Sequence, residues 1–249
     1  MYDGKLSVII LAGGYMDEFP DTPKAMLKIG SETLLNITVD AFLDQKKIDQ
    51  IICVGNNIPE SPNYTLVKPD NDTIIGSFIP ALKATKNQKI VISASDMRDI
   101  NKKDVRQFVD NGLKTDAGFN WALAEEKDVK DKYRGLKKTS ATLRDKGKVV
   151  GGNIFVVDRS VLESKENLEL CDMMLSKRKS LSKMASVLGW DFLILYTLST
   201  LGMPVLTVKA IEKRFGKAIK TKAKAIFGPP SLTVDIDNME RYQYFLDRI

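Results

Sequence analysis

A pair of glycines and a lysine near the start of the chain could together bind phosphate groups. The apolar segment of residues 6–12 leads into Gly13 and Gly14, and a loop then delivers Pro23 and Lys24. The glycines have no side chain to keep an anion away from the backbone N–H groups, and they tolerate positive φ. The Lys24 ammonium supplies a point charge for phosphate oxygens. A tight turn beside a solvated lysine is the alternative, but the complete string favours a phosphate-binding loop.

Three aspartates are candidates for holding a divalent cation. Asp96 follows the apolar segment 90–95, which would place its carboxylate at the C-terminal end of a strand, although an aspartate that caps the helix expected at Asn101 is the alternative. Asp235 and Asp237 alternate along a second extended segment, so both side chains would lie on one face. Mg²⁺ usually takes one or two carboxylates together with substrate phosphates. Asp96 and Asp237 fit that pattern, with Asp235 as a supporting or alternative ligand, although acidic residues are also common near helix N-termini.

The absence of histidine narrows the chemistry further. It excludes Ser-His and Cys-His nucleophilic pairs, HExxH zinc sites and histidine proton shuttles. Neither a Walker A string nor a GxGxxG fingerprint occurs. Cys53 and Cys171 offer no disulfide framework or zinc site, and Cys53 lies in an apolar run typical of a core. Catalysis would therefore depend on carboxylates, lysines, backbone amides and a hard metal ion.

Strand and helix patterns alternate along the chain in the way that builds a mainly parallel sheet. Strands are predicted over residues 6–12, 50–55, 89–95, 116–124 and 149–157, and helices over 33–45, 75–85 and 103–112. This alternation predicts an α/β fold with helices on both faces of the sheet. Ligands of such folds bind at the carboxyl ends of the strands, where the Gly13–Gly14 loop and Asp96 would meet.

The end of the chain predicts one more strand and helix. Residues 231–237 have strand character, and Asp237 or Asn238 would cap the helix that follows.

These motifs resemble the signature of the MobA-like NTP transferases, which are related to the sugar-phosphate nucleotidylyltransferases. The resemblance rests on Leu-Ala-Gly-Gly at 11–14, Pro-Lys-Ala-Met-Leu at 23–27, Ile-Gly at 29–30 and Asp-Ile-Asp at 235–237. It implies a Rossmann-like, GT-A-like domain with three α/β/α layers around a mainly parallel mixed sheet. It also implies transfer of NMP from an NTP to a phosphorylated acceptor, with Mg²⁺ as cofactor and release of pyrophosphate.

The resemblance also implies roles for individual residues. Lys24, Asp96 and Asp237 would be catalytic, and the metal would bind to Asp96 and Asp237, with Asp235 nearby. The residues expected to contact substrates are Leu11, Ala12, Gly13, Gly14, Gly76, Ser77, Gly152 and Asn153. For two of these pairs a structural alternative stays open: a helix begun by a serine at 76–77, and a strand bulge without a ligand at 151–153.

Two positions depart from the family pattern. Family members commonly carry an arginine four residues after the second glycine, where it grips the triphosphate, but this chain has Glu18. A negative charge there lowers affinity for a triphosphate unless it contacts the metal or points away. Arg98 stands where a proline usually follows the Asp-Met pair. The departures leave open a divergent subfamily or a protein whose catalysis is weakened or lost.

The C-terminal third differs most from the core family. At 249 residues the chain suits one domain, 1–249, with a helical, basic insertion at about 172–224. The apolar run 192–201 falls short of the roughly 20 residues of a membrane span and favours a core or dimer-interface helix. The basic segment 209–224 could attract phosphate groups, nucleic acid or anionic lipid, or form a solvated helix face. Similar tails, with a motif like Arg178-Lys179-Ser180, occur in one branch of MobA-like proteins.

The expected partners follow from this assignment. The formal net charge of +6 favours polyanionic ligands. We expect an NTP and a phosphorylated small molecule, allow for a weak membrane-surface contact and a homodimer, and expect no specific nucleic acid. The N-terminal apolar stretch is too short for a signal peptide, so a cytoplasmic enzyme is expected. The alternatives are a molybdenum-cofactor guanylyl- or cytidylyltransferase, a glycosyltransferase using a nucleotide-sugar, and a non-catalytic nucleotide- or nucleic-acid-binding protein.

Overall fold

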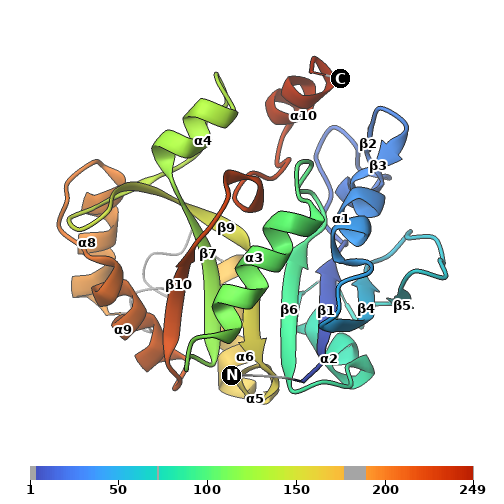
Figure 1. Ribbon diagram of the computed structural model, residues 1–249, viewed down its shortest axis with the longest axis horizontal. Coiled ribbons are helices and arrows are strands. Elements are labelled where there is room, and N and C mark those ends of the chain that lie inside the picture. The colour runs from blue at the N-terminus through green and yellow to red at the C-terminus, as the bar shows by residue number, and fades with distance from the viewer. Residues whose placement is uncertain (1–3, 72, 177–188, 249) are drawn as a thin grey trace.

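The computed structural model describes residues 4–71, 73–176 and 189–248. Over these residues the chain forms an eight-stranded sheet in the order β10-β7-β9-β6-β1-β4-β5, with β8 paired to β9 (Figure 1). The pairs made by β9 are antiparallel and the others are parallel. The strands of this sheet are β1 (Leu6–Leu11), β4 (Ile48–Val54), β5 (Thr65–Val67), β6 (Lys89–Ala94), β7 (Phe119–Glu125), β8 (Ala141–Leu143), β9 (Gly147–Asp158) and β10 (Ala223–Phe227).

Helices connect most of these strands, and a small hairpin, β2 (Lys28–Ile29) with β3 (Glu32–Thr33), follows the first loop. The α-helices are α1 (Leu34–Phe42), α2 (Ile74–Ala84), α3 (Lys102–Leu113), α4 (Glu126–Lys132), α5 (Arg159–Glu163), α6 (Lys165–Ser176), α8 (Trp190–Thr200), α9 (Val208–Ala218) and α10 (Met239–Leu246). Two short 3₁₀ helices are η1 (Lys24–Met26) and η2 (Pro230–Leu232). Helix starts follow ordinary capping chemistry: the Asn101 side chain accepts a hydrogen bond from the backbone at the start of α3.

The central strand β1 is buried on both faces, which makes the fold three-layered. Val8 and Ile10 pack with α1 and α3, where Phe42 and Phe108 complete one core cluster. Ile9 points to the opposite face and packs in a second cluster that includes α2, α5 and α6. A strand covered on both faces needs a continuous apolar run, which is the pattern of residues 6–12. The predicted α/β fold with a mainly parallel mixed sheet flanked by helices is confirmed.

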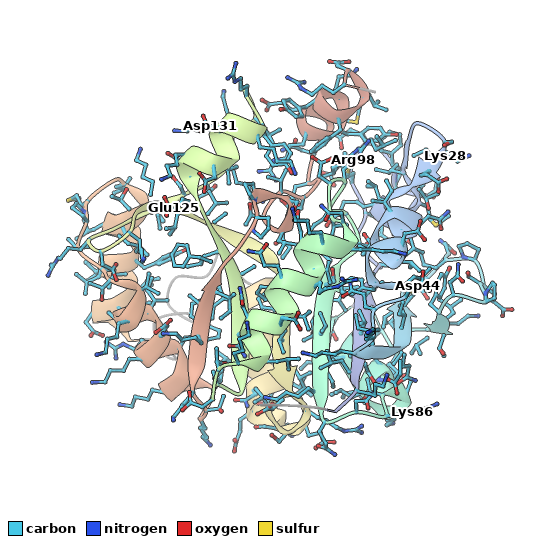
Figure 2. The ribbon with its side chains drawn as sticks, in the orientation of Figure 1. Lys28, Asp44, Lys86, Arg98, Glu125 and Asp131 are labelled. Carbon is cyan, nitrogen blue, oxygen red and sulfur yellow. The ribbon has the colours of Figure 1, made fainter. Side chains whose placement is uncertain are left out.

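The carboxyl ends of β6 and β7 lie at the same edge of the sheet. Figure 2 shows Arg98, just after β6, and Glu125, the last residue of β7, toward the upper end of the molecule. Lys86, which precedes β6, lies at the lower end. The loops at the upper edge are therefore the ones that can build a site.

The predicted strand at 231–237 is wrong. η2 occupies the start of this segment, and the rest crosses the end of the sheet with one backbone bond to the loop after β6, from Ile236 N to Asp96 O at 3.0 Å. Both β6 and β7 already have a neighbour on each side, so no strand edge is open to it. The helix cap is Asn238, whose side chain accepts from Arg241 N at 3.0 Å.

The C-terminal third forms helices and an edge strand. Phe192 and Leu193 of α8 are buried, whereas Ile194, Tyr196 and Leu201 of the same run are exposed. β10 begins at Ala223, within the range expected to be helical. In the part of the chain that the structure describes, no helix is long and apolar enough to span a membrane. The Arg178-Lys179-Ser180 motif lies outside the described residues. Cys53 is fully buried in the core, as predicted.

Adjacent glycines in β9 should respond differently to substitution. A Cβ at Gly152 would lie 2.6 Å from the Ala122 Cβ and 2.8 Å from the Leu232 carbonyl oxygen, whereas a Cβ at Gly151 would meet no atom within 4 Å. Gly152→Ala should therefore lower the free energy of unfolding by about 1–3 kcal/mol through overpacking. The matched Gly151→Ala variant should leave it unchanged or slightly higher, since it reduces the freedom of the unfolded chain. Urea unfolding of both variants tests this, and equal effects would contradict it.

Candidate active site

Lys24 joins two carboxylates that are far apart in the sequence. Its Nζ lies 2.6 Å from Asp96 Oδ2, in the loop after β6, and 3.3 Å from Asp237 Oδ1, just before α10. The lysine is fixed by its own backbone, since Lys24 N donates to Gly14 O at 2.7 Å. A Cβ at Gly14 would lie 3.0 Å from Lys24 Cε, so the glycine leaves room for the lysine to cross the loop. The structure thus brings together the three residues predicted to be catalytic.

Burial and charge oppose one another in this cluster. Burial raises the pKa of Asp96 above its ordinary value, although the neighbouring Lys24 acts in the opposite direction. Burial also acts to lower the pKa of Lys24, but attraction from Asp96 and Asp237 outweighs it, so the pKa is raised. Burial also acts to raise the pKa of Asp237, but the positive charges of Lys24 and Arg241 outweigh it and hold that pKa below its ordinary value. The lysine therefore stays charged, and it keeps the Asp237 carboxylate ionised.

A second group of charges adjoins the first. Asp235 Oδ1 pairs with Lys138 and, at 2.9 Å, with Arg241 Nη1. The same Arg241 nitrogen lies 3.1 Å from Asp237 Oδ2, so Asp237 is shared between Arg241 and Lys24. Lys138 and Arg241 were not predicted from the sequence. A signal for Arg241 was present, because it stands four residues after Asp237, the spacing of neighbours on a helix face.

The carboxylates suit a hard cation that also binds substrate. Asp96 is 6% exposed, and its Oδ1 is buried without a hydrogen-bond partner among the described residues. Such an oxygen is an open ligand position of the type that Mg²⁺ prefers. Within the same residues no group of three or more acidic, Cys or His side chains could hold a metal by itself. A Mg²⁺ ion at Asp96 and Asp237 would therefore need phosphate or water oxygens to complete its shell.

A cavity of about 690 Å³ opens beside Asp96. Its walls come from the loop after β1, the end of β6, the segment before α2 and the first turn of α2. Residues of the predicted site that line it are Leu11, Gly13, Gly14, Lys24, Ser77 and Asp96. Residues that the sequence analysis missed are Tyr15, Asn56, Pro69, Asn71, Thr73, Ala94 and Ser95.

Four other predicted substrate contacts lie outside this cavity wall. Ala12 is fully buried, and its N–H donates to Val54 O at 2.8 Å. A Cβ at Gly76 would lie 2.2 Å from Asn71 Oδ1, so glycine at 76 allows the loop to pack against α2. Gly152 is crowded by its neighbours in the sheet. Asn153 carries a buried side-chain nitrogen that has no hydrogen-bond partner in the described part of the chain.

Glu18, the acidic residue that departs from the family pattern, does not line the cavity. Glu18 lies in a turn closed by the bond from Phe19 N to Met16 O at 2.9 Å, and it is exposed. The Phe19 ring packs edge-on against Tyr242 with centroids 5.8 Å apart, which holds the turn against α10. Glu18 is not among the residues that line the 690 Å³ cavity. Its charge therefore does not enter the space next to Lys24.

Comparisons with known proteins point to one group. The profile of the MobA-like NTP transferase domain matches residues 8–229. No curated protein matches the chain significantly. A solved hypothetical transferase from Thermus thermophilus superposes with a TM-score of 0.79 at 23% identity, covering 95% of this chain and 98% of that one.

Two further solved structures are more distant. The 2-C-methyl-D-erythritol 4-phosphate cytidylyltransferase of Thermus thermophilus superposes with a TM-score of 0.57 at 15% identity, covering 98% of this chain and 100% of that one. A CMP:2-keto-3-deoxy-manno-octonic acid synthetase, solved with CTP, gives a TM-score of 0.58 at 10% identity, with 98% of both chains covered. At these identities the likenesses show a shared fold.

Removing the lysine should destabilise the protein in a pH-dependent way. Lys24→Met should lower the free energy of unfolding by about 1–3 kcal/mol at pH 8, because the buried Asp96 carboxylate loses its counter-charge. The native pKa of Asp96 is already raised, and the substitution raises it further. Below the native pKa of Asp96 the carboxyl is protonated in both the wild type and the variant, so the loss should be smaller near pH 4 and should grow as pH rises through that native pKa.

Urea unfolding between pH 4 and pH 8 measures this difference. Lys28→Met is the matched control, because Lys28 is exposed on β2 (Figure 2). A loss that is the same at both ends of the pH range would contradict the prediction.

Proposed function

The chain belongs to the MobA-like NTP transferase family, whose members are nucleotidyltransferase enzymes, and from this we propose that it transfers NMP from an NTP to a phosphorylated small molecule, with Mg²⁺ and release of pyrophosphate. The observation that carries the proposal is the position of Lys24, next to the Gly13–Gly14 loop and paired with Asp96 and Asp237. One cation and two carboxylates at a glycine loop are suited to a triphosphate and its metal.

The cavity supports an NTP as the donor. Its volume of about 690 Å³ falls within the usual range of small-ligand sites. The phosphates would lie at Gly13, Gly14 and Lys24, where backbone N–H groups and an ammonium can neutralise them. Asn71 and Ser77, which also line the cavity, have polar side chains that could form hydrogen bonds with the sugar or base.

The proposed reaction requires alignment and charge neutralisation more than proton transfer. An acceptor phosphate oxygen attacks the α-phosphorus in line, the bond from that phosphorus to the oxygen bridging the β-phosphate breaks, and pyrophosphate leaves with the electron pair. Phosphate is already ionised at neutral pH, so no general base is needed and the lack of histidine is no obstacle. Lys24 would neutralise charge on the leaving pyrophosphate.

The remaining residues of the cluster would hold the metal and the acceptor. Asp96 Oδ1 and Asp237 would hold Mg²⁺, which when bound supplies charge neutralisation at the phosphate oxygens. Lys138 and Arg241 lie on the other side of Asp237 and would attract the acceptor phosphate. Asp235 pairs with both cations and would hold them in position.

Nucleotide binding tests the donor site directly. One of ATP, CTP, GTP, UTP and dTTP, at about 100 times its Kd and with Mg²⁺, should stabilise the protein by about 2.7 kcal/mol, or roughly 5–10 °C in Tm. Asp96→Ala should remove the Mg²⁺-dependent part of this shift. Asp131→Ala, on the exposed side of α4, is the matched control and should retain it (Figure 2). The absence of a shift with every NTP would sink the proposal in favour of a non-catalytic protein.

Turnover tests the role of the lysine. Lys24→Ala should lower kcat/KM by roughly 10²–10³-fold, the scale for one preorganised charge-stabilising donor. Pyrophosphate release measured with a panel of sugar, polyol and alkyl phosphates gives the rate, and Lys28→Ala should retain the wild-type value. Normal turnover by Lys24→Ala would rule out this assignment.

A further inference from the structure

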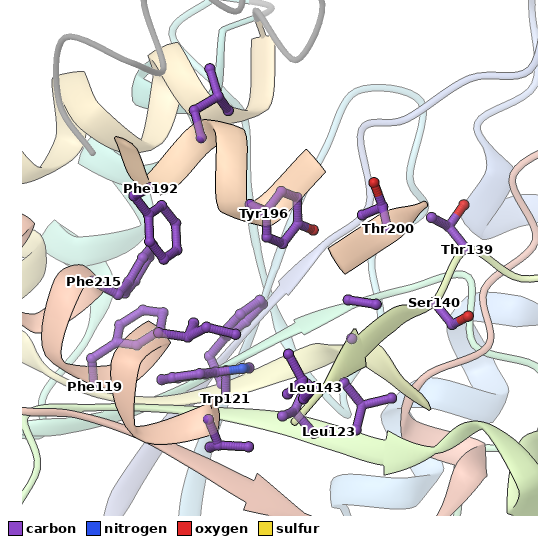
Figure 3. A pocket seen from close by; sticks show the side chains of 17 residues that line it. Phe119, Trp121, Leu123, Thr139, Ser140, Leu143, Phe192, Tyr196, Thr200 and Phe215 are labelled. Atoms are coloured by element: carbon purple, nitrogen blue, oxygen red, sulfur yellow. The ribbon is translucent and has the colours of Figure 1, made fainter. Parts of the chain in front are cut away.

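A second cavity, of about 310 Å³, lies between the sheet and helices α8 and α9 (Figure 3). Its walls are rich in aromatic side chains, and several of the rings contact one another with centroids 5.3–6.3 Å apart. The rings are those of Phe119, Trp121, Phe155, Phe192, Tyr196 and Phe215. Protein interiors are normally close-packed, so an apolar space of this size is a candidate for a ligand site.

The cavity has a polar end. Figure 3 shows Thr139, Ser140 and Thr200 together at one side, while Phe192 and Phe215 lie at the other. Among the described residues that line the cavity, hydroxyl groups other than that of Tyr196 occur only at this end. A ligand that suits the cavity therefore has an apolar body and a polar head near Thr139.

The polar end adjoins the charged cluster of the candidate active site. Thr139 also lines a pocket formed with Lys137, Lys138, Asn238, Glu240 and Arg241, where three cations outnumber one carboxylate. Arg241 in turn contacts Asp237 at 3.1 Å. The aromatic cavity is therefore followed by the hydroxyl groups near Thr139, and then by the cations Lys137, Lys138 and Arg241. Beyond these cations lies the Asp237 carboxylate, which pairs with both Arg241 and Lys24. A phosphate among the cations would lie next to the proposed NTP site, with whatever it carries directed toward the rings.

We propose that the aromatic cavity holds the apolar body of the acceptor, so that the acceptor is a phosphate monoester of a small apolar alcohol. This rests on the proposed function, because it identifies the acceptor of that reaction. Polyol phosphates fit poorly, since their hydroxyls would lose hydrogen bonds to water among the rings. The volume of about 310 Å³ is at the lower end for ligand sites, which suits one short chain or ring and not a two-chain lipid.

A substitution at Gly151 can be used to fill the cavity. It lines the wall, and a Cβ built on it meets no atom within 4 Å. A larger side chain at 151 can therefore enter the space without displacing backbone. Gly151→Leu would occupy the cavity, and Gly151→Ala is the matched control because it makes the same backbone change with little added volume.

Binding can be followed without turnover. The chain has two tryptophans, Trp121 in the cavity wall and Trp190, which is 60% exposed on α8. In a Trp190→Phe background, Trp121 emission reports the cavity alone. Titration with monomeric ethyl, butyl, hexyl and octyl phosphate should give affinities that rise by up to about fourfold for each added methylene until the cavity is full. Glycerol 3-phosphate should bind no more tightly than ethyl phosphate.

The cavity variants sharpen the test. Gly151→Leu should weaken hexyl phosphate at least about tenfold while keeping the NTP-induced Tm shift, and Gly151→Ala should stay within about threefold of its parent. Affinity that does not depend on chain length, or equal affinities in the two variants, would overturn the inference. A Trp121 response to protein concentration alone would also overturn it, because the cavity would then receive a second copy of the chain.

Pyrophosphate release separates this inference from the proposed function. If affinity follows chain length but no alkyl phosphate supports release, the cavity binds apolar phosphate esters and the proposed chemistry fails. If release occurs with glycerol 3-phosphate and alkyl phosphates at equal kcat/KM, the chemistry stands and the apolar acceptor is wrong.

Discussion

The pairing of Lys24 with Asp96 and Asp237 is the constraint on which the rest of the site depends. Asp96 lies at the end of an inner strand, where burial disfavours its charge, and it needs a cation that reaches it from outside the sheet. That cation is 72 residues away from Asp96 and 213 from Asp237 along the chain. The sheet order, the glycine loop and the segment before α10 together bring the three side chains within hydrogen-bonding distance.

β9 has different surroundings on its two faces. It is the antiparallel strand between β6 and β7, so it runs from the charged edge into the body of the sheet. Neighbouring residues of a strand face opposite sides, and this accounts for the different surroundings of Gly151 and Gly152. One borders an open aromatic space, and the other is pressed against β7 and η2. The two adjacent glycines therefore differ in role: Gly152 is required by close packing, and Gly151 borders the aromatic cavity.

Sequence predicted the parts of the fold that are specified locally. β1 and β6 were visible because strands buried on both faces must be continuously apolar, and the Gly13–Gly14 loop because its chemistry is local. The 231–237 segment was mistaken for a strand, since its alternating residues satisfy a core contact that does not require strand pairing. Lys138 could not be predicted, because it pairs with Asp235 from 97 residues away, whereas Arg241 pairs with Asp235 and Asp237 within one local segment and could have been found from its spacing.

The backbone bond from Ile236 N to Asp96 O ties the last segment to the loop after β6. During synthesis the sheet strands β1 to β9 can assemble well before this segment emerges, since domains begin to fold as the chain is made. The charged cluster, however, stays incomplete until Asp237 arrives. A chain folded only as far as β9 would thus have the cavity beside Lys24 and Asp96 without the second carboxylate, and the charged cluster would form only when the segment before α10 packs onto the end of the sheet.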